Sequence, residues 1–194
     1  MTHRQPRFSP LTMENLNETQ RPVVAQLAKL STRGLGGPFG IMLKSPLMAK
    51  GMIELFEYYR FKSTLDPRLR ELATLIVARE WTAQFEWWAH APMAAKAGLS
   101  EALIADLRLG KHPATLKDDE ATVYELVIAM LRRHEVGDDA FARALALLGE
   151  EKLVDLITLV GEYLKLSLIL NVGQVGIPEG GEPPLPPLAP GNAP

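Results

Sequence analysis

Helix-start signals recur along this chain, and they constrain its fold more than any other feature. Proline directly follows Ser45 and Asp66, and Ser100, Asp118 and Asp138 each precede a run of helix-favouring residues. A serine or aspartate side chain at a helix start accepts a backbone N–H that the helix leaves unpaired, and proline suits the first helical turn. These signals predict helices at about 46–61, 68–81, 84–96, 101–109, 118–134, 138–148 and 151–170, after a first helix within 17–30.

No segment alternates polar and apolar residues with the period of two that marks a strand, so the predicted fold class is all-α. The 194 residues suffice for one domain with its own core. We expect this helical domain at 17–171, after an extended segment at 1–16. Seven of the 15 prolines lie in 172–194, which predicts an extended tail that straps over a neighbour. Pro92, inside the helix predicted at 84–96, predicts a kink or break close to His90.

Composition excludes several function classes. The chain has no cysteine, so disulfides, thiolate nucleophiles and zinc–thiolate sites are excluded. A net charge of -2 without a cluster of basic residues argues against nucleic acid as a partner. No run reaches the roughly 18 apolar residues of a membrane span and no signal-peptide pattern is found, so we expect no membrane partner and a cytoplasmic location. The hydrophobic content of 47% is high for a monomer and predicts a homo-oligomer.

Side chains suited to chemistry gather in the two helices predicted between residues 68 and 96. Glu86 and His90 are four positions apart, so their side chains project from one helix face with one turn between them. A carboxylate in that position can orient an imidazole, the side chain that exchanges protons most readily near neutral pH. Glu71, in the preceding helix, has leucine, isoleucine and valine neighbours that suggest the edge of a core. His90, Glu86 and Glu71 are therefore the candidate catalytic residues.

Four segments resemble, in order, the carboxymuconolactone decarboxylase family, the all-helical group that also contains the alkylhydroperoxidase D enzymes. They are GPFGIMLKSPLMAKGM, TLDPRLRELATLIVAR, FEWWAHAPMAAKAGLS and LVGEYLKLSLILNVGQVGIP, which lie between Gly37 and Pro178. The resemblance implies a single-domain helical bundle of the alkylhydroperoxidase D type. It also implies assembly as a homo-trimer or a homo-hexamer.

The thiol peroxidase branch of this family has a glutamate, then C-x-x-C, then a histidine four residues after the second cysteine. By resemblance the glutamate is Glu71 and the histidine is His90, whereas the cysteine positions hold Ala83 and Glu86. The thiolate is the nucleophile of that reaction, so thiol peroxidase activity is excluded. The E-W-x-x-H pattern at 86–90 resembles the decarboxylase branch, with Phe85 where an aromatic residue is usual.

The resemblance implies a decarboxylase, or a related lactone-processing enzyme, acting on a small cyclic carboxylic acid or lactone similar to 4-carboxymuconolactone. The electrons of the leaving carboxylate can flow into a conjugated lactone carbonyl, so no cofactor is expected. His90 would protonate the ring carbon, Glu86 would hold the imidazole, and Glu71 would be a second proton carrier. A metal is not expected, because carboxylate-bridged iron proteins use repeated Glu-x-x-His pairs and this chain has no such repeat.

Three further residues are candidates for binding the substrate. Arg79, if it points inward, would pair with a carboxylate through its planar guanidinium. Trp87 would suit a flat lactone if it faces a cavity, although a tryptophan here also fits a core or an interface. Asn171, after the apolar last helix, is implied by the resemblance alone.

Other interpretations stay open at this point. His90 also suits simple packing against a carboxylate, and Glu71 suits an ion pair with an arginine. The same proton carriers would serve an isomerase or a dehydratase, and a member of this fold without turnover would be a ligand-binding or assembly module. A cavity enclosing His90, Glu86 and Glu71 would favour an enzyme, whereas a filled core would favour the module.

Overall fold

A computed structural model describes residues 5–31, 34–178 and 181–188 of the chain. Over these ranges the backbone forms helices joined by turns and irregular segments, without a strand, so the predicted all-α, single-domain fold is confirmed. The π-helical turn η1 extends the seventh helix. The elements are α1 (Gln20–Leu27), α2 (Phe39–Met42), α3 (Pro46–Phe61), α4 (Pro67–Glu80), α5 (Gln84–Lys96), α6 (Glu101–Arg108), α7 (Asp118–Ile128), η1 (Ala129–Arg133) and α8 (Asp138–Gly173).

Local sequence explains where several of these helices begin. The Asp66 side chain accepts the backbone N–H of Arg68 at the start of α4, and the Ser100 side chain accepts that of Leu103 at the start of α6. Ser45 differs from this prediction, because its side chain makes no capping hydrogen bond and α3 begins on Pro46 alone. The capping side chains of Asp66 and Ser100 and the first-turn prolines Pro46 and Pro67 thus set where α3, α4 and α6 begin.

Glycine and proline have different effects on the helices that contain them. Gly149 has a φ of 72° and breaks α8 into the two helical parts predicted at 138–148 and 151–170. Pro92 does not break α5, which runs as one helix from Gln84 to Lys96, so the expected break before His90 does not occur. The short helix α2 was not predicted, because it begins inside the glycine-rich segment 34–40 and glycine disfavours a helix.

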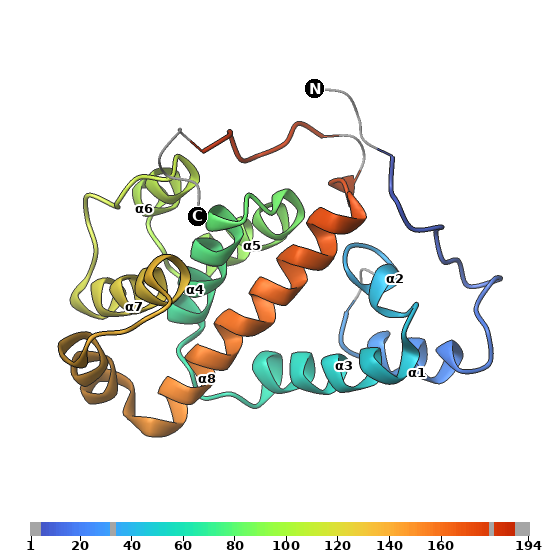
Figure 1. Cartoon of the computed structure of the whole chain (residues 1–194), viewed down its shortest axis with the longest axis horizontal. Coiled ribbons are helices and arrows are strands. Elements are labelled where there is room, and N and C mark those ends of the chain that lie inside the picture. The colour runs from blue at the N-terminus through green and yellow to red at the C-terminus, as the bar shows by residue number, and fades with distance from the viewer. Residues whose placement is uncertain (1–4, 32–33, 179–180, 189–194) are drawn as a thin grey trace.

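The core is built around α4, which packs against α5, α7 and α8 (Figure 1). Leu72, Ala73, Leu75 and Val77 of α4 are fully buried in the larger of the two main apolar clusters. The smaller cluster joins α1, α2 and α3 to the second half of α8, at Leu166. In Figure 1 the second half of α8 crosses the molecule between α4 and α5 on one side and the α1–α3 unit on the other. This arrangement places α8 beside the space where the two clusters meet.

The described part of the proline-rich tail, residues 181–188, is extended and packs on helices of its own chain. Figure 1 shows it as the red segment along the top of the view, which runs above α5 toward α6. Leu185 is 2% exposed and belongs to the larger apolar cluster, and Gln84 of α5 holds its backbone. We call residues 181–188 the strap.

Among the described residues, no helix is both long and apolar enough to cross a lipid bilayer.

Candidate active site

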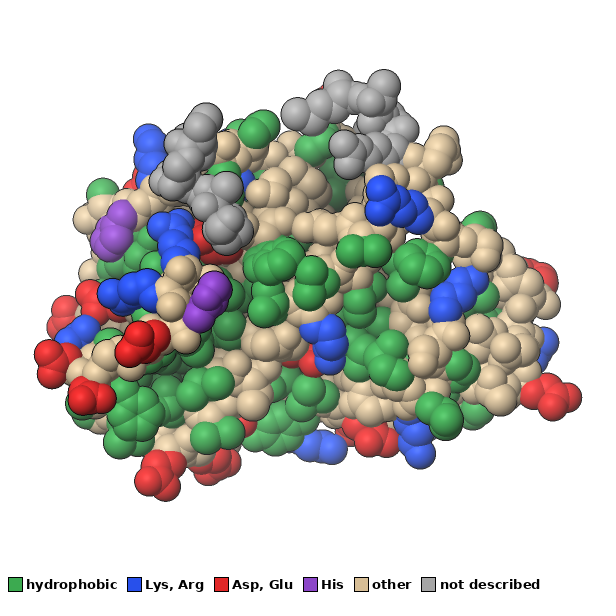
Figure 2. Space-filling view, viewed as in Figure 1, with side chains coloured by type: hydrophobic (Ala, Val, Ile, Leu, Met, Phe, Trp, Pro, Cys, Tyr) green, Lys and Arg blue, Asp and Glu red, His purple; other side chains and the backbone are tan. Residues whose placement is uncertain are grey.

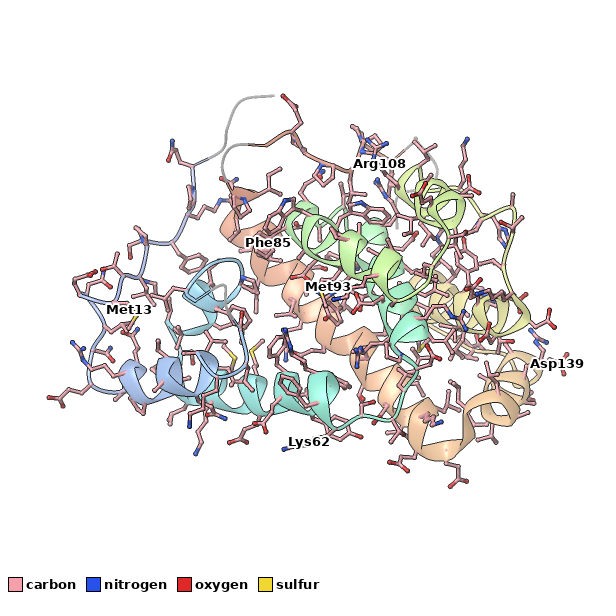
Figure 3. All side chains as sticks on the ribbon, turned by 180° about the vertical axis from the view of Figure 1, so that it is seen from behind. Met13, Lys62, Phe85, Met93, Arg108 and Asp139 are labelled. Atoms are coloured by element: carbon pink, nitrogen blue, oxygen red, sulfur yellow. The ribbon has the colours of Figure 1, made fainter. Side chains whose placement is uncertain are left out.

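A cavity of about 110 Å³ opens between α2, α3, α4, α5 and α8, where the two apolar clusters meet. Figure 3 shows the molecule from behind and labels two wall residues of α5, Phe85 and Met93. Its apolar lining residues are Pro38, Phe39, Met42, Met52, Phe56, Phe85, Ala89, Met93 and Leu166. Its polar or charged lining residues are Ser31, Tyr59, Arg60, Arg70, Glu71, Glu86, His90, Glu162 and Tyr163. The cavity therefore has an apolar wall facing a group of titratable side chains.

His90 lies at the centre of this polar group. Its Nδ1 is 2.8 Å from Oε2 of Glu71, and its Nε2 is 3.5 Å from Oε2 of Glu86. The side chain of His90 is 13% exposed and those of both glutamates are 5% exposed, so these contacts are shielded from bulk water. With the ring proton on Nδ1, the imidazole donates to Glu71 and directs the Nε2 lone pair away from it. The three residues predicted from sequence thus meet at one cavity.

Two helices bring these side chains together. Glu71 comes from α4, which is buried on almost every side, and Glu86 and His90 come from one face of α5. Residues four apart on a helix lie one above the other, which is why Glu86 reaches the same ring as Glu71 from the opposite edge. The order α4, tight turn, α5 is therefore sufficient to enclose one imidazole between two carboxylates.

Tyr163 of α8 is a member of this group that the sequence analysis missed. Its hydroxyl is 3.3 Å from Nε2 of His90, and the two rings meet edge to face with centroids 5.0 Å apart. Burial, together with the negative charges of Glu71 and Glu86, raises the pKa of Tyr163 well above its usual value. Tyr163 therefore keeps its proton at neutral pH and donates a hydrogen bond. The only signal for it was a tyrosine inside LVGEYLKLS, a segment that the family resemblance already included.

Two arginines also line the cavity. Nη1 of the half-buried Arg70 donates to the backbone oxygen of Tyr59 at 2.5 Å, and Arg70 lines the cavity. Arg60 is exposed and lies over the rings of Phe56 and Phe61, at centroid distances of 5.8 and 5.6 Å. Positive charge is therefore present at the cavity, but not from the arginine that the sequence analysis selected.

None of the three predicted substrate-binding residues lines the cavity. Arg79 is 2% exposed and points to the other side of α4, where Nη1 donates to the backbone oxygens of Arg108 and Pro186. Trp87 is 3% exposed and packs in the larger apolar cluster, as the alternative core interpretation expected. Asn171 is exposed and donates to the backbone oxygen of Trp81 at 2.7 Å, so it holds the turn between α4 and α5.

The described residues contain no group of three or more histidine, aspartate or glutamate side chains arranged to hold a metal ion. Glu71 and Glu86 both face the imidazole of His90, so these side chains contact one another instead of surrounding a space for an ion. Its arrangement is that of a proton-handling site. A buried imidazole between carboxylates, beside a tyrosine hydroxyl, can deliver or accept a proton at a fixed position in the cavity.

Comparison with known proteins agrees with this description. No curated protein matches the chain. The profile of the carboxymuconolactone decarboxylase family matches residues 46–129, a range that begins with α3 and includes Glu71, Glu86 and His90. Over these residues the chain is similar to the carboxymuconolactone decarboxylase family.

Proposed function

We propose that this chain is a cofactor-independent enzyme that decarboxylates, or otherwise processes, a small cyclic carboxylic acid of the lactone type. The observation that carries the proposal is the position of His90 on a largely apolar cavity, 2.8 Å from Glu71 and 3.3 Å from the hydroxyl of Tyr163. The volume of about 110 Å³ is of the same order as the roughly 150 Å³ of a buried cavity that holds benzene, so the cavity limits a ligand to a small molecule.

In the proposed reaction, the bond between a ring carbon and the substrate carboxylate breaks. Its electron pair moves through the conjugated system to the lactone carbonyl oxygen, and carbon dioxide leaves. Protonated His90 then donates its Nε2 proton to the ring carbon and regains a proton from water. The apolar wall favours the first step, because the localised charge of the carboxylate depends more on hydration than the delocalised charge of the enolate that replaces it.

The other polar side chains have supporting roles in this proposal. Glu71 fixes the ring of His90 through Nδ1, and Glu86 stabilises the protonated ring from the Nε2 side. Tyr163, which keeps its proton, donates a hydrogen bond to the developing enolate oxygen. Arg70 replaces Arg79 as the candidate partner for a substrate carboxylate, because Arg70 lines the cavity and Arg79 does not.

The cavity that His90, Glu86 and Glu71 line together favours an enzyme over a ligand-binding or assembly module, for which a filled core was expected. Incubating the full chain with a carboxylated butenolide similar to 4-carboxymuconolactone tests this choice. Catalytic release of one carbon dioxide per lactone consumed supports the decarboxylase. Loss of lactone without carbon dioxide would replace it with the isomerase or dehydratase alternative. Binding measured by calorimetry, without turnover, would replace it with the module.

We also propose that the chain assembles as a homo-trimer or homo-hexamer through α8. Apolar side chains gather on the face shown in Figure 2, where α8 crosses the molecule. Val154, Ile157, Leu168 and Val172 are each more than 40% exposed and recur at helical spacing on α8. The variant Ile157→Glu should lower the mass measured by light scattering, and a wild-type mass of 21.4 kDa at micromolar concentration would contradict the proposal.

A further inference from the structure

The strap is held by side chains that recognise its backbone. The backbone oxygen of Pro184 accepts from Nε of Arg108 at 2.6 Å, and that of Pro186 accepts from Nη1 of Arg79 at 2.8 Å. Between them, Gln84 pairs with both backbone groups of Leu185: Oε1 accepts the N–H at 2.8 Å and Nε2 donates to the oxygen at 2.9 Å. Every backbone donor and acceptor from 184 to 186 therefore has a side-chain partner on α4, α5 or α6.

The prolines of the strap explain why three side chains are enough to pair all of its backbone groups from 184 to 186. Pro184 and Pro186 have no backbone N–H, so the only donor in this stretch is that of Leu185, which Gln84 takes. Proline on both sides also keeps the segment extended before it docks, which lowers the entropy lost on binding. The sequence Pro-Pro-Leu-Pro-Pro at 183–187 is thus complementary to the three side chains that hold it.

The site has an apolar pocket as well as polar contacts. Leu185 is 2% exposed and contacts the larger apolar cluster, and Leu188 lies against Gly110, where a β-carbon would come within 2.8 Å of its side chain. The pocket and the polar contacts together form a groove between α4, α5 and α6, which we call the strap groove. Grooves that recognise proline-rich peptides likewise exploit the preformed extended backbone of the ligand.

Arg79 shows that this groove needs an occupant. Its guanidinium is buried, burial lowers its pKa, and its Nε has no hydrogen-bond partner among the described residues. Removing the strap would leave Nη1 with the backbone oxygen of Arg108 alone. A buried cation that loses an acceptor is costly unless another acceptor replaces it.

We propose that the strap groove is a peptide-binding site specific for a leucine flanked by prolines, and that the strap is its tethered ligand. The site lies outside the cavity and does not depend on the proposed reaction. Because the strap is part of the same chain, its effective concentration at the groove is of millimolar order, and a free peptide competes poorly with it. Disabling the strap by one substitution should therefore open the groove to the same peptide added in trans.

The test uses the full chain with Leu185→Asp, which places a charge where the apolar anchor sits, and a fluorescent peptide with the sequence of residues 181–188. Fluorescence anisotropy should show saturable binding to the variant, at least about 10-fold tighter than to the wild-type chain. A control peptide with aspartate in place of the leucine should not bind. Failure of the peptide to bind the folded variant, or equal binding of both peptides, would overturn the proposal.

A second measurement keeps the proposal testable if Leu185→Asp does not fold. The chain has no cysteine, so Glu182→Cys gives one attachment point for a spin label, on an exposed residue of the strap. The spin label should move slowly when the strap is docked. Adding Gln84→Ala should make the motion of the label fast, because both hydrogen bonds to Leu185 are lost and the strap undocks. Adding Gln26→Ala, a substitution on α1, is the matched control and should leave the label slow. An unchanged spectrum in the Gln84→Ala chain would contradict recognition of the strap by this groove.

Discussion

The pair of helices α4 and α5 has two polar faces, and the buried polar side chains of each face have different hydrogen-bond partners. On the cavity face, Glu71 and His90 satisfy each other beside an open space. On the strap face, Arg79 and Gln84 bind backbone groups of a segment that fills the groove. Buried charge beside a cavity indicates chemistry on a ligand, whereas buried charge beneath a docked segment indicates stability. Burial of a polar side chain alone, which both faces share, does not separate these roles.

The two faces also differ in whether their side chains can exchange protons. The cavity face holds groups that exchange protons, a histidine, two carboxylates and a tyrosine, within hydrogen-bonding reach of one another. The strap face holds an arginine and a glutamine, which keep their protonation state through the ordinary pH range. Substitutions on the cavity face should therefore change activity with little effect on stability, and substitutions on the strap face should do the reverse.

The largest expected effect is that of His90→Gln on turnover. Removing the positioned acid should lower kcat on a carboxylated butenolide by about 10²–10⁴, with a smaller change in KM. Helix content by circular dichroism and the urea midpoint should stay close to those of the wild type. His134→Asn, at an exposed histidine with a positive φ that asparagine tolerates, is the matched control and should keep full activity. Unfolding of His90→Gln would instead identify a structural histidine.

The strap face is tested by Leu185→Ala. Truncating this buried anchor should lower the free energy of unfolding by about 2–5 kcal/mol, read from urea denaturation with an unchanged slope. The side chains that we propose as catalytic are untouched, so kcat of the folded fraction should change far less than in His90→Gln. Met13→Ala, at a residue that is 58% exposed, should change stability by less than about 0.5 kcal/mol. Equal effects of the two truncations would mean that the strap does not stabilise the fold.

Glu86→Gln should have an intermediate effect on the cavity face. The amide keeps the shape of the side chain but removes the charge that stabilises the protonated ring of His90, so kcat should fall by about 10–100-fold. Glu54→Gln, on the exposed face of α3, removes the same charge away from the cavity and should be neutral. If Glu86→Gln lowers kcat as much as His90→Gln, Glu86 itself is the acid.

The smallest expected effect concerns pH and a charged pair away from both faces. A hydrogen bond from Arg68 holds the pKa of Asp119 below its usual value of 3.8, and the Arg68 charge adds to this. A lowered pKa in the folded state gives stability that is present above pH 3.8 and lost as pH falls through the folded pKa. Asp119→Asn should therefore be less stable than wild type at pH 7, by under about 1 kcal/mol, and the two should converge near pH 2. A gap that widens on acidification would contradict this assignment.

Local structure followed closely from sequence, because its causes are local. Asp66 and Ser100 cap the helices that they were predicted to begin, and Gly149 interrupts α8 where a helix end was expected. Glu86 and His90 share a face because they are four residues apart on α5. Their meeting with Glu71 required only that two neighbouring helices pack against each other.

Contacts between residues far apart in the chain could not be predicted from the sequence. Arg70 and Arg79 are nine positions apart, about two and a half helical turns, so they point to opposite sides of α4. Which of them faces a cavity depends on α8 and the strap, and Arg79 pairs with Pro186, 107 residues away. Tyr163 is 73 residues from His90 and was missed for the same reason. The residues that line a cavity are set by packing between distant segments.

The central claim is that His90 delivers a proton to one face of the substrate, and deuterium incorporation tests it most directly. Turnover of a carboxylated butenolide in D2O should place one deuterium on a single face of the protonated ring carbon, as read by proton NMR of the product in the presence of a chiral shift reagent. In His90→Gln, the residual product should carry deuterium on both faces, because water replaces the positioned acid. Equal labelling of both faces by the wild-type chain, or an unchanged one-sided pattern in His90→Gln, would contradict the account.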